Sequence, residues 1–389
     1  MNQTNQQLKV LELFAGMGSP AKALKNLNID HQIIDAVEID EKAMKAYNSI
    51  HSTNFEIQDI QKWDKNLKCD YLHASTPCQS FSTAGKNIGE DDPRGKILWE
   101  HTLRIIKKTE PKIISLENVK GLISKKHKNL LDWFLNELEN LGFKNTWKIL
   151  NSKEFGVPQN RERVFIISSK TNQPFFENFI PNYKPISSII DANAKWIQPK
   201  NIKQKDNLFY FKNELSQYNG KIIELNTNLI NKKFEPSINK IATIKKQNWD
   251  NFNFDNLEDL DFNSAKNFTN INGITGTLRA SPDAKHECKL IDVSFQQDKY
   301  FLDIEGITGA LTTTSPDFKN KILYQSKDSF IFYRRLTSLE VVKLMGFDEE
   351  DFNKMISNNL SENQICKISG NSIVVNVMEF VIKNLVKML

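Results

Sequence analysis

The stretch LFAGMGSPA, residues 13–21, joins an apolar run to a segment with helical spacing. The apolar run begins at Val10 and is typical of a buried strand, and Pro20 suits the first turn of a helix. Gly16 and Gly18 permit a tight turn and let a ligand approach the backbone at the helix N-terminus. The stretch therefore predicts a Rossmann-like strand–turn–helix unit, and it leaves a nucleoside ligand and a purely structural turn both open.

Strands and helices alternate through the first half of the chain. Further strands are expected at residues 33–39, 70–74, 112–116 and 163–168, and helices at residues 20–27, 41–50, 97–107 and 130–141. Because helical crossovers connect parallel strands, this alternation predicts an α/β fold with a mostly parallel sheet that helices cover on both faces.

The pattern changes near Thr171, where a loop rich in proline begins. Residues 196–328 mix asparagine, lysine and phenylalanine without clear periodicity, and regular spacing returns afterwards, ending in the helical run 372–389. We therefore expect the N-terminal part of a catalytic domain over residues 1–195, a smaller inserted domain over residues 196–328, and a C-terminal segment, residues 329–389, that completes the first domain.

Two acidic residues are placed where a nucleotide would need them. Glu38 ends the second expected strand, and a carboxylate at this point after a glycine-rich turn can accept hydrogen bonds from both ribose hydroxyls. Asp59, in the stretch QDI, is expected to follow a third short strand and can accept a hydrogen bond from the amino group of adenine. The alternative for Asp59 is a surface aspartate in a turn.

The cysteines are Cys69, Cys78, Cys288 and Cys366, and they form no CxxC pair or Cys/His cluster, which argues against a disulfide framework and a zinc site. Cys78 differs from an ordinary core cysteine, because it follows Pro77 in a loop of small and hydroxyl-bearing residues beyond a strand end. Chemistry in parallel-sheet folds takes place at the carboxyl ends of the strands, so we predict a nucleophilic thiol, although no base stands beside it in the sequence.

Charged residues mark two further strand ends. Glu117 and Asn118 follow the apolar strand at residues 112–116, and a glutamate there becomes a proton donor if burial raises its pKa. Arg161 and Arg163 alternate at the entrance to the next strand, so both guanidinium groups are expected on one side, where they can bind an anion or a carbonyl. A charged strand entrance without a ligand is the alternative.

The order of these elements resembles one family, the cytosine-C5 DNA methyltransferases. The resemblance covers residues 8–170 and 330–389 and rests on the series LFAGMGS, VEID, QDI, STPCQSFSTAGK, DPRGKILWE, SLENVKGL, FGVPQNRERVFII, RRLTSLEVVKLMGF and ISGNSIVVNVMEFV. The Pro-Cys-Gln, Glu-Asn-Val and Gln-x-Arg-x-Arg elements are highly specific in this order. The central region matches only loosely, as expected for the variable target-recognition domain of that family.

The resemblance implies roles for the matching positions. Cys78 would attack C6 of a flipped-out cytosine, Glu117 would act at N3 of the base, and Arg161 and Arg163 would support it. The methyl donor would be S-adenosylmethionine, without a metal. Its implied site consists of Phe14, Ala15, Gly16, Gly18, Glu38, Ile39, Asp59, Ile60, Pro77, Leu98, Asn371 and Ser372.

Two positions depart from the family pattern. Ser19 replaces a frequent glycine, and Ile39 stands where an aromatic residue is common. The second departure puts the packing of adenine in question.

Double-stranded DNA is the implied substrate, and the lysines of the central region suit contacts to phosphates. Two similar stretches, INGITGTLRASPD from Ile271 and IEGITGALTTTSPD from Ile304, are either similar hairpins or two loops that both approach the ligand. The expected DNA contacts are Gln79, Ser82, Lys86, Asn118, Gln159, Gly276, Thr277, Gly309 and Thr312.

Composition constrains the setting more than the chemistry. The formal net charge of +5 is compatible with a polyanionic partner but too small to imply one. Residues 1–9 lack the pattern of a signal peptide, and no apolar run approaches the roughly 20 residues of a membrane helix. We therefore expect a cytoplasmic protein of a bacterial or phage-infected cell, without a membrane partner.

The resemblance implies a restriction–modification or phage modification setting, in which a restriction endonuclease acting on the same site is the corresponding partner. A monomer suffices for a reaction on a single base. An RNA cytosine methyltransferase is an alternative, because a tRNA-methylating branch shares these motifs. A non-catalytic DNA-binding homologue is another, and it would need a broken catalytic set, whereas Cys78, Glu117 and Arg163 are all present.

Overall fold

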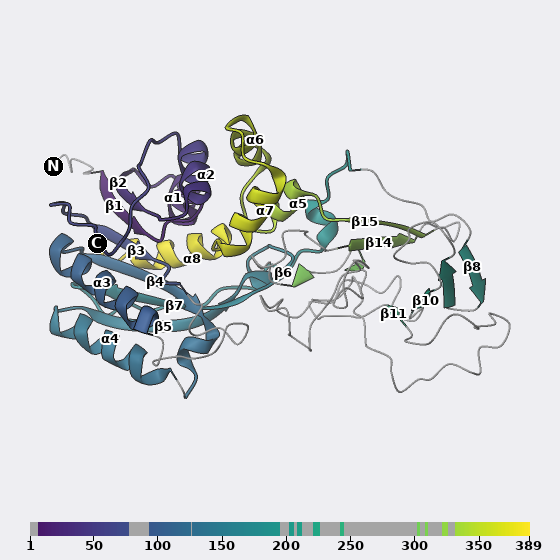
Figure 1. The fold of residues 1–389 in the computed structure, drawn as a ribbon. Helices are drawn as coiled ribbons and strands as arrows, with labels where there is room; N and C mark the ends of the chain where they lie inside the picture. The colour runs from purple at the N-terminus through teal and green to yellow at the C-terminus, as the bar shows by residue number, and fades with distance from the viewer. Residues whose placement is uncertain are drawn as a thin grey trace.

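The computed structural model describes residues 7–77, 93–125, 127–194 and 336–389, together with the backbone of short strands between residues 202 and 335; for residues 93–98 it describes the backbone only. The main element is a six-stranded sheet with the order β2-β1-β3-β4-β7-β5 (Figure 1). The strands are β1 (Leu8–Leu13), β2 (His31–Val37), β3 (Tyr71–Ala74), β4 (Ile113–Val119), β5 (Lys144–Asn151) and β7 (Glu162–Ser169).

The sheet is mostly parallel, as predicted. The β2, β1, β3 and β4 strands pair in parallel, and β7 alone runs antiparallel to its neighbours β4 and β5. The edge strand β5 was not expected from the sequence, because its run KNTWKILN begins with three polar residues and lacks regular alternation. It buries only its last positions fully. These features make an α/β fold of the Rossmann-like class with one reversed strand.

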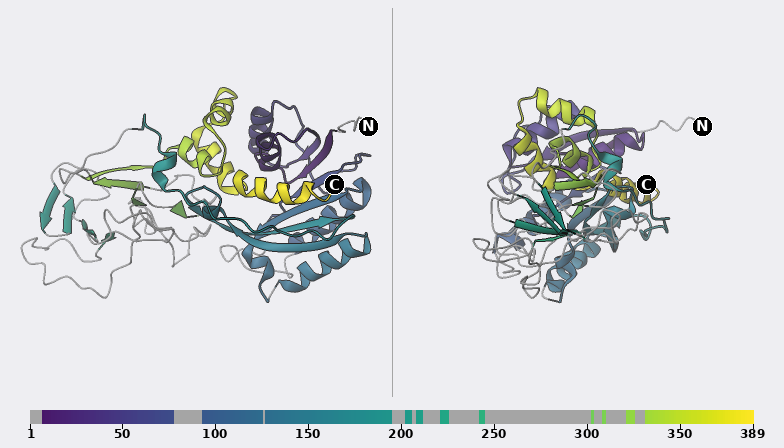
Figure 2. Two further views of the ribbon diagram at one scale, coloured as in Figure 1. Left: turned by 180° about the vertical axis from the view of Figure 1, so that it is seen from behind. Right: turned by 90° about the vertical axis from the view of Figure 1, so that its right-hand side faces the viewer.

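Helices cover both faces of this sheet (Figures 1 and 2). On one face, α3 (Pro93–Thr109) and α4 (Lys128–Asn140) share a core with Leu11 and Leu13 of β1. On the other face, α1 (Ser19–Asn26) and α8 (Val375–Val386) share a core with Val10 of β1. Alternate residues of one strand therefore enter different cores, which explains why the strands read as continuous apolar runs.

The remaining helices are α2 (Glu41–His51), α5 (Ser338–Lys343), α6 (Glu349–Ser357) and α7 (Glu362–Asn371), and short 3₁₀ turns span Lys120–Ile123, Ser152–Glu154 and Ile186–Ile189. The apolar run expected as one helix over residues 372–389 begins helical geometry only at Val375, because Ser372 ends α7 in an extended conformation. Length and composition alone would let the run Glu362–Val386 cross a membrane, but 72% of its apolar window is buried inside the protein, so packing accounts for its hydropathy.

The central region contributes strands only as backbone. One four-stranded sheet has the order β11-β10-β9-β8, formed by Ala242–Ile244, Lys221–Leu225, Leu208–Phe211 and Ile202–Lys205. A three-stranded sheet consists of β12 (Leu302–Asp303), β14 (Lys321–Gln325) and β15 (Ile331–Arg335). The β8 and β10 strands lie at the opposite end of the molecule from α3 and α4 (Figures 1 and 2).

The C-terminal segment docks on α1 through a buried ion triad. The Lys22 ammonium lies 2.6 Å from Asp348 Oδ2 and 2.7 Å from Asp351 Oδ2. The side chains of Lys22 and Asp351 are 7% and 2% exposed, whereas Asp348 is half-exposed. Burial raises the pKa of Asp351 despite the neighbouring ammonium, so its charged form depends on Lys22.

We expect the replacement Lys22→Met to lower the free energy of unfolding by about 3 kcal/mol at pH 7, because it leaves a buried carboxylate without its cation. Removing the ammonium raises the folded-state pKa of Asp351 further. An acid whose folded pKa is raised destabilises the fold above its unfolded pKa of about 4, so the loss should shrink as the pH falls toward about 5.

Urea unfolding of the wild-type protein and of Lys22→Met, at pH 7 and at about pH 5, measures this loss in the free energy of unfolding. Lys42→Met is the matched control, since Lys42 makes an exposed ion pair with Glu41 and should change stability by less than about 0.5 kcal/mol. An equal loss for both variants, or a loss that grows toward acid pH, would contradict the assignment.

Candidate active site

The glycine-rich turn after β1 adopts backbone conformations that few residues tolerate. Phe14, Gly16 and Gly18 all have positive φ angles, of 54°, 56° and 75°. A Cβ atom on Gly18 would lie 2.2 Å from His51 Nε2, so no larger residue fits there without displacement. A Cβ on Gly16 would meet nothing within 4 Å, which leaves open space over the backbone at the start of α1. This space is where a ligand can approach the turn, as the sequence predicts.

Glu38 follows β2 and faces that turn. Its Oε2 accepts a hydrogen bond from the backbone N–H of Gly16 at 3.0 Å, and its Oε1 accepts one from Asp40 at 2.8 Å. Burial raises the pKa of Glu38, and these backbone donors oppose the rise. A carboxylate has about four acceptor sites, so beside these backbone donors the group can still accept a hydrogen bond from a ribose hydroxyl.

Of the residues expected around an adenine, Ile39 directly follows this carboxylate, and Asp59 and Ile60 follow Gln58, whose backbone N–H donates to the carbonyl of Glu38. Ile39 is 67% exposed, whereas Ile60 is only 5% exposed and belongs to the core. Asp59 is half-buried, and its Oδ1 accepts a hydrogen bond from the backbone N–H of Gln61 at 2.9 Å. The expectation of a third strand before Asp59 is wrong: residues 53–58 form no strand. One backbone hydrogen bond joins Gln58 to Glu38, just after β2, and the Gln58 side chain donates to Asp35 and Ala36 of β2.

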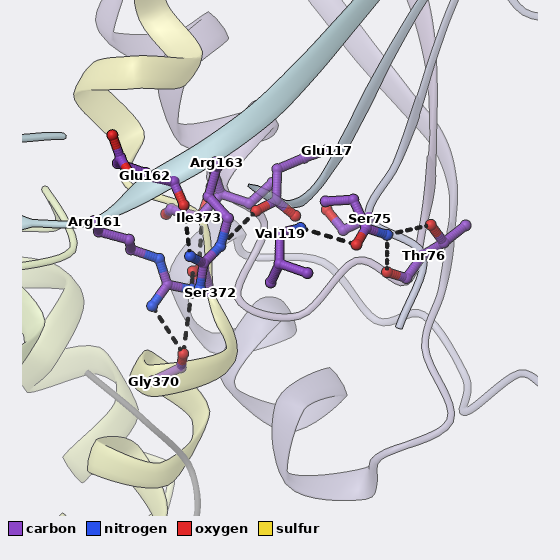
Figure 3. Close-up of polar contacts among 12 residues, drawn as sticks. Ser75, Thr76, Glu117, Val119, Arg161, Glu162, Arg163, Gly370, Ser372 and Ile373 are labelled. Atoms are coloured by element: carbon purple, nitrogen blue, oxygen red, sulfur yellow. Dashed lines mark hydrogen bonds and ion pairs between the residues drawn. The ribbon is translucent and has the colours of Figure 1, made fainter. Parts of the chain in front are cut away.

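The strand end that leads to Cys78 is fixed by buried hydrogen bonds. Asn118 is 2% exposed, and its Nδ2 donates to the carbonyl and the hydroxyl oxygens of Thr76 at 3.0 Å and 2.9 Å (Figure 3). The ring of His73 lies 2.9 Å from Ser75 Oγ and 2.7 Å from Ser115 Oγ. Burial lowers the pKa of His73 to about 3, so the ring is neutral and bridges the two hydroxyls as donor to one and acceptor to the other.

Pro77 is exposed and is the last described residue before this loop. The predicted site residues Cys78, Gln79, Ser82 and Lys86 lie outside the described residues, as do Gly276, Thr277 and Thr312. For Leu98 the structure describes only the backbone, within α3.

Glu117 and Arg163 form a buried ion pair beside this strand end. Arg163 Nε lies 3.1 Å from Glu117 Oε1, and the two side chains are 16% and 10% exposed (Figure 3). In the β4–β7 register Val119 faces Arg163, so Glu117 is the diagonal neighbour of the arginine on the same face of the sheet. Burial raises the pKa of Glu117, and the charges of Arg163 and Arg161 oppose the rise.

Arg161 takes different partners from Arg163. Its guanidinium donates to the carbonyl of Gly370 at 3.3 Å and to that of Ser372 at 2.9 Å (Figure 3). The two arginines therefore lie near one carboxylate, but Arg161 is bonded to the turn between α7 and α8. Within this turn Asn371 is exposed and Ser372 is buried.

Ser19 joins the glycine-rich turn to the same C-terminal turn. Its hydroxyl lies 2.9 Å from Ser372 Oγ and donates to the carbonyl of Ile373 at 2.7 Å. A glycine at position 19 could make neither contact, so the departure from the family pattern has a structural use in this chain.

Gln159 is buried, and its Nε2 donates to the carbonyl of Leu344 at 2.7 Å. With Asn160 it forms the short strand β6 (Gln159–Asn160), which pairs in parallel with β13 (Thr308–Gly309). In this conformation the side chains of Gln159 and Asn118 support the protein itself, and the geometry offers no support for direct DNA contacts by either. The pairing does bring the backbone of Gly309 beside the strand that precedes Arg161.

Several supporting residues escaped the sequence-based prediction. They are His73, Thr76, Ser115 and the partners of the loop at residues 58–65, all of which act through contacts between segments that are distant in the chain. Among these contacts between distant segments, one position carried a signal in the sequence: Ser19, which departs from the family pattern.

The chain thus has an α/β fold with open space over a glycine-rich turn and a buried acid–arginine pair at the strand ends. A family model described as C-5 cytosine-specific DNA methylase matches residues 8–387. The chain therefore belongs to this family and is a DNA cytosine-C5 methyltransferase, and the family implies S-adenosylmethionine as the methyl donor.

Similar proteins come from phages and bacteria. The chain is 28% identical to an orphan methyltransferase, M.SPRI, of Bacillus phage SPR, with 98% of both chains covered. It is equally identical to the type II methyltransferase M2.ScrFI of Lactococcus lactis subsp. cremoris, with 98% of this chain and 99% of the relative covered. These relatives support a modification-system enzyme.

Solved structures confirm the fold. The Entamoeba histolytica methyltransferase EhMeth aligns with a TM-score of 0.60 at 15% identity over 98% of both chains. The S. pombe Dnmt2 methyltransferase aligns with a TM-score of 0.57 at 16% identity, over 98% of this chain and 99% of that chain.

Proposed function

We propose that this enzyme methylates C5 of a flipped-out cytosine in a short duplex DNA sequence through a transient covalent bond to Cys78. The observation that carries the proposal is the buried Glu117–Arg163 pair, which Asn118 of the same strand connects to Thr76, two residues before Cys78. The predicted Glu117 and Arg163 thus meet beside the segment that leads to Cys78.

The chemistry begins at Cys78. Cytosine C5 is a poor nucleophile, and attack of the Cys78 thiolate on C6 makes C5 enamine-like and reactive. Bound S-adenosylmethionine would supply an electrophilic methyl group for that carbon and would be left as the neutral thioether S-adenosylhomocysteine. Loss of the C5 proton to water and expulsion of the thiolate then restore the aromatic ring. The thiolate is thus regenerated, and the proton is the only group the base loses.

Glu117 and Arg163 act on the base during the attack. The carboxyl group, whose pKa burial raises, holds a proton at N3 and offsets the negative charge that builds on the ring. The guanidinium of Arg163 lies beside this carboxyl group and would stabilise negative charge at O2 of the cytosine. Arg161 supports the site indirectly, because its hydrogen bonds hold the turn that carries Asn371.

The methyl donor would be held by the residues around the glycine-rich turn. The open space over Gly16 and the Glu38 carboxylate beside it fit a nucleoside, with the carboxylate as acceptor for ribose hydroxyls. Asn371 reaches the site from the C-terminal turn that Ser19 and Arg161 hold in place.

The target must leave the helix before these groups can reach it. Flipping costs a few kcal/mol, which contacts to the pocket and the groove offset. We assign sequence choice to residues 196–328 and phosphate contacts to the lysines there, with the Gly309 backbone next to the catalytic domain through β6 and β13. A monomer is sufficient for this reaction on a single base, and the reaction would take place on DNA in the cytoplasm. In a type II setting, the corresponding partner is a restriction endonuclease that acts on the same DNA site.

Incubation of the purified protein with a labelled methyl donor tests this function. We expect label in duplex DNA of mixed sequence and none in tRNA transcripts of equal mass. Label in tRNA alone would replace the proposal with RNA methylation. Bisulfite sequencing of DNA from expressing cells should then show one short sequence methylated throughout, and scattered methylation would contradict a specific modification enzyme.

A further inference from the structure

The loop at residues 58–65 carries the two residues expected beside adenine, and it lacks strand partners. Residues 53–70 belong to no strand, so a sheet ladder does not hold the backbone of Asp59 and Ile60. Such a segment keeps one conformation only if side chains from regular elements bind it. Lys108 of α3 contacts Asp64 of this loop, and two further charged groups, Asp35 and Arg104, bind the residues around Ile60 and Trp63.

Asp35 of β2 receives the first set of contacts. It is 1% exposed, and its carboxylate accepts hydrogen bonds from Gln58 Nε2 at 2.9 Å, Trp63 Nε1 at 2.7 Å and Lys65 Nζ at 2.9 Å. All three donors belong to the one loop. Burying a carboxylate is costly unless donors satisfy its oxygens, so the loop and the carboxylate require each other.

Arg104 of α3 provides the second set. Its Nη1 donates to the carbonyl of Trp63 at 2.7 Å and its Nη2 to the carbonyl of Ile60 at 2.9 Å. A planar guanidinium that spans two carbonyls fixes their relative orientation, which an ammonium cannot do as well. The loop is therefore held from β2 on one side and from α3 on the other.

We propose that Asp35 and Arg104 are positioning residues for the adenosine end of the methyl donor. Neither needs to touch the ligand: they hold Asp59 and Ile60 in place before it arrives, which removes the cost of ordering the loop during binding. The proposal rests on the proposed S-adenosylmethionine site. Its consequence is that these residues set the affinity for the donor and leave the methyl-transfer step unchanged.

Arg104→Met tests the proposal, because it keeps the aliphatic stem and removes both contacts to carbonyls. We expect the Kd for S-adenosylmethionine, measured by calorimetry, to rise about tenfold, with kcat at saturating donor within about twofold of wild type. Arg104→Lys should recover part of the affinity. Lys107→Met is the matched control on the same helix, since Lys107 pairs with Glu137 on the surface, and it should bind as wild type does.

A second readout separates positioning from a general loss of structure. S-adenosylhomocysteine has an adenine amino group, from which Asp59 would accept a hydrogen bond. S-inosylhomocysteine carries an oxo group at this position and cannot donate from it. Wild type should therefore prefer the adenine compound, and Arg104→Met should reduce this preference severalfold, whereas Lys107→Met should retain it. If Arg104→Met does not fold, Trp63→Phe decides, because it removes the N–H that reaches Asp35 and keeps an aromatic ring in the core.

The outcomes are distinguishable. A wild-type protein that binds no S-adenosylmethionine overturns the proposed function. The positioning role alone is overturned if wild type binds S-adenosylmethionine and both Arg104→Met and Trp63→Phe keep the wild-type Kd and adenine preference. A reduced kcat at unchanged Kd would also overturn it, because the loop would then act on the chemical step.

Discussion

Cys78→Ala is expected to abolish methyl transfer to duplex DNA, with at least a roughly 10⁴-fold loss of kcat and an unchanged Kd for S-adenosylmethionine. The size follows from the proposed mechanism: without attack at C6 the C5 carbon stays unreactive. The proposed cofactor contacts lie on the glycine-rich turn and around Glu38, so they should not depend on the thiol.

Duplex DNA carrying 5-fluorocytosine gives a second measurement of the same step. Fluorine at C5 cannot leave as a proton does, so the wild-type enzyme should remain covalently attached to the DNA after methyl transfer. Cys78→Ala should form no such adduct. Denaturing gel electrophoresis with labelled DNA separates the two results.

Cys69→Ala is the matched control for this prediction. The Cys69 thiol is 5% exposed, and burial raises its pKa to about 12, so it is inert at neutral pH. The control should retain activity and trapping. Full activity in Cys78→Ala, or loss of trapping in Cys69→Ala alone, would show that the nucleophile has been assigned to the wrong residue.

Glu117→Gln is expected to lower kcat by about 10²- to 10³-fold with little change in the affinity for the methyl donor. The amide keeps the shape of the side chain but cannot hold a transferable proton at N3, which removes general acid catalysis. It also takes the negative partner away from Arg163, whose Nε lies 3.1 Å from the carboxylate.

The pH profile should change in a defined direction. Burial raises the pKa of Glu117, and the reaction uses its protonated form, so wild-type kcat should fall as the pH rises through that pKa. Glu117→Gln should lose this alkaline limb. Glu162→Gln is the control, because Glu162 makes an exposed ion pair with Lys120, and it should keep both the rate and the profile. An unchanged limb in Glu117→Gln would assign the proton to another group.

Local patterns predicted the parts of this enzyme that depend on short stretches. The turn after β1, the acid after β2 and the charged end of β4 follow apolar runs, and parallel strands bring such ends together. The charged start of β7 reaches the same edge because β7 runs antiparallel to β4. The ion pair of Glu117 with Arg163 could be anticipated because both residues lie near neighbouring strand ends.

Contacts between distant segments were beyond such patterns. Nothing in β2 marks Asp35 as a buried acceptor for a loop that begins more than twenty residues later. The different partners of Arg161 and Arg163 could not be predicted either, since alternate spacing places both on one side but does not say which one meets the C-terminal turn. Strand spacing likewise suggested a ladder before Asp59, where side chains hold the loop instead.

The return of the C-terminal segment onto α1 also bears on how the enzyme is made. The helix α8 packs against α1, β4 and β7, and Ser372 meets Ser19 across 353 positions of the chain. During synthesis, the glycine-rich turn and the strand ends leave the ribosome long before the segment that completes them. Contacts of such long sequence separation make folding slow, so the newly made N-terminal region spends that interval with part of its apolar face uncovered. This interval ends only when residues 337–386 have been synthesised. If the ribosome pauses before this segment, the incomplete chain should be unable to methylate DNA.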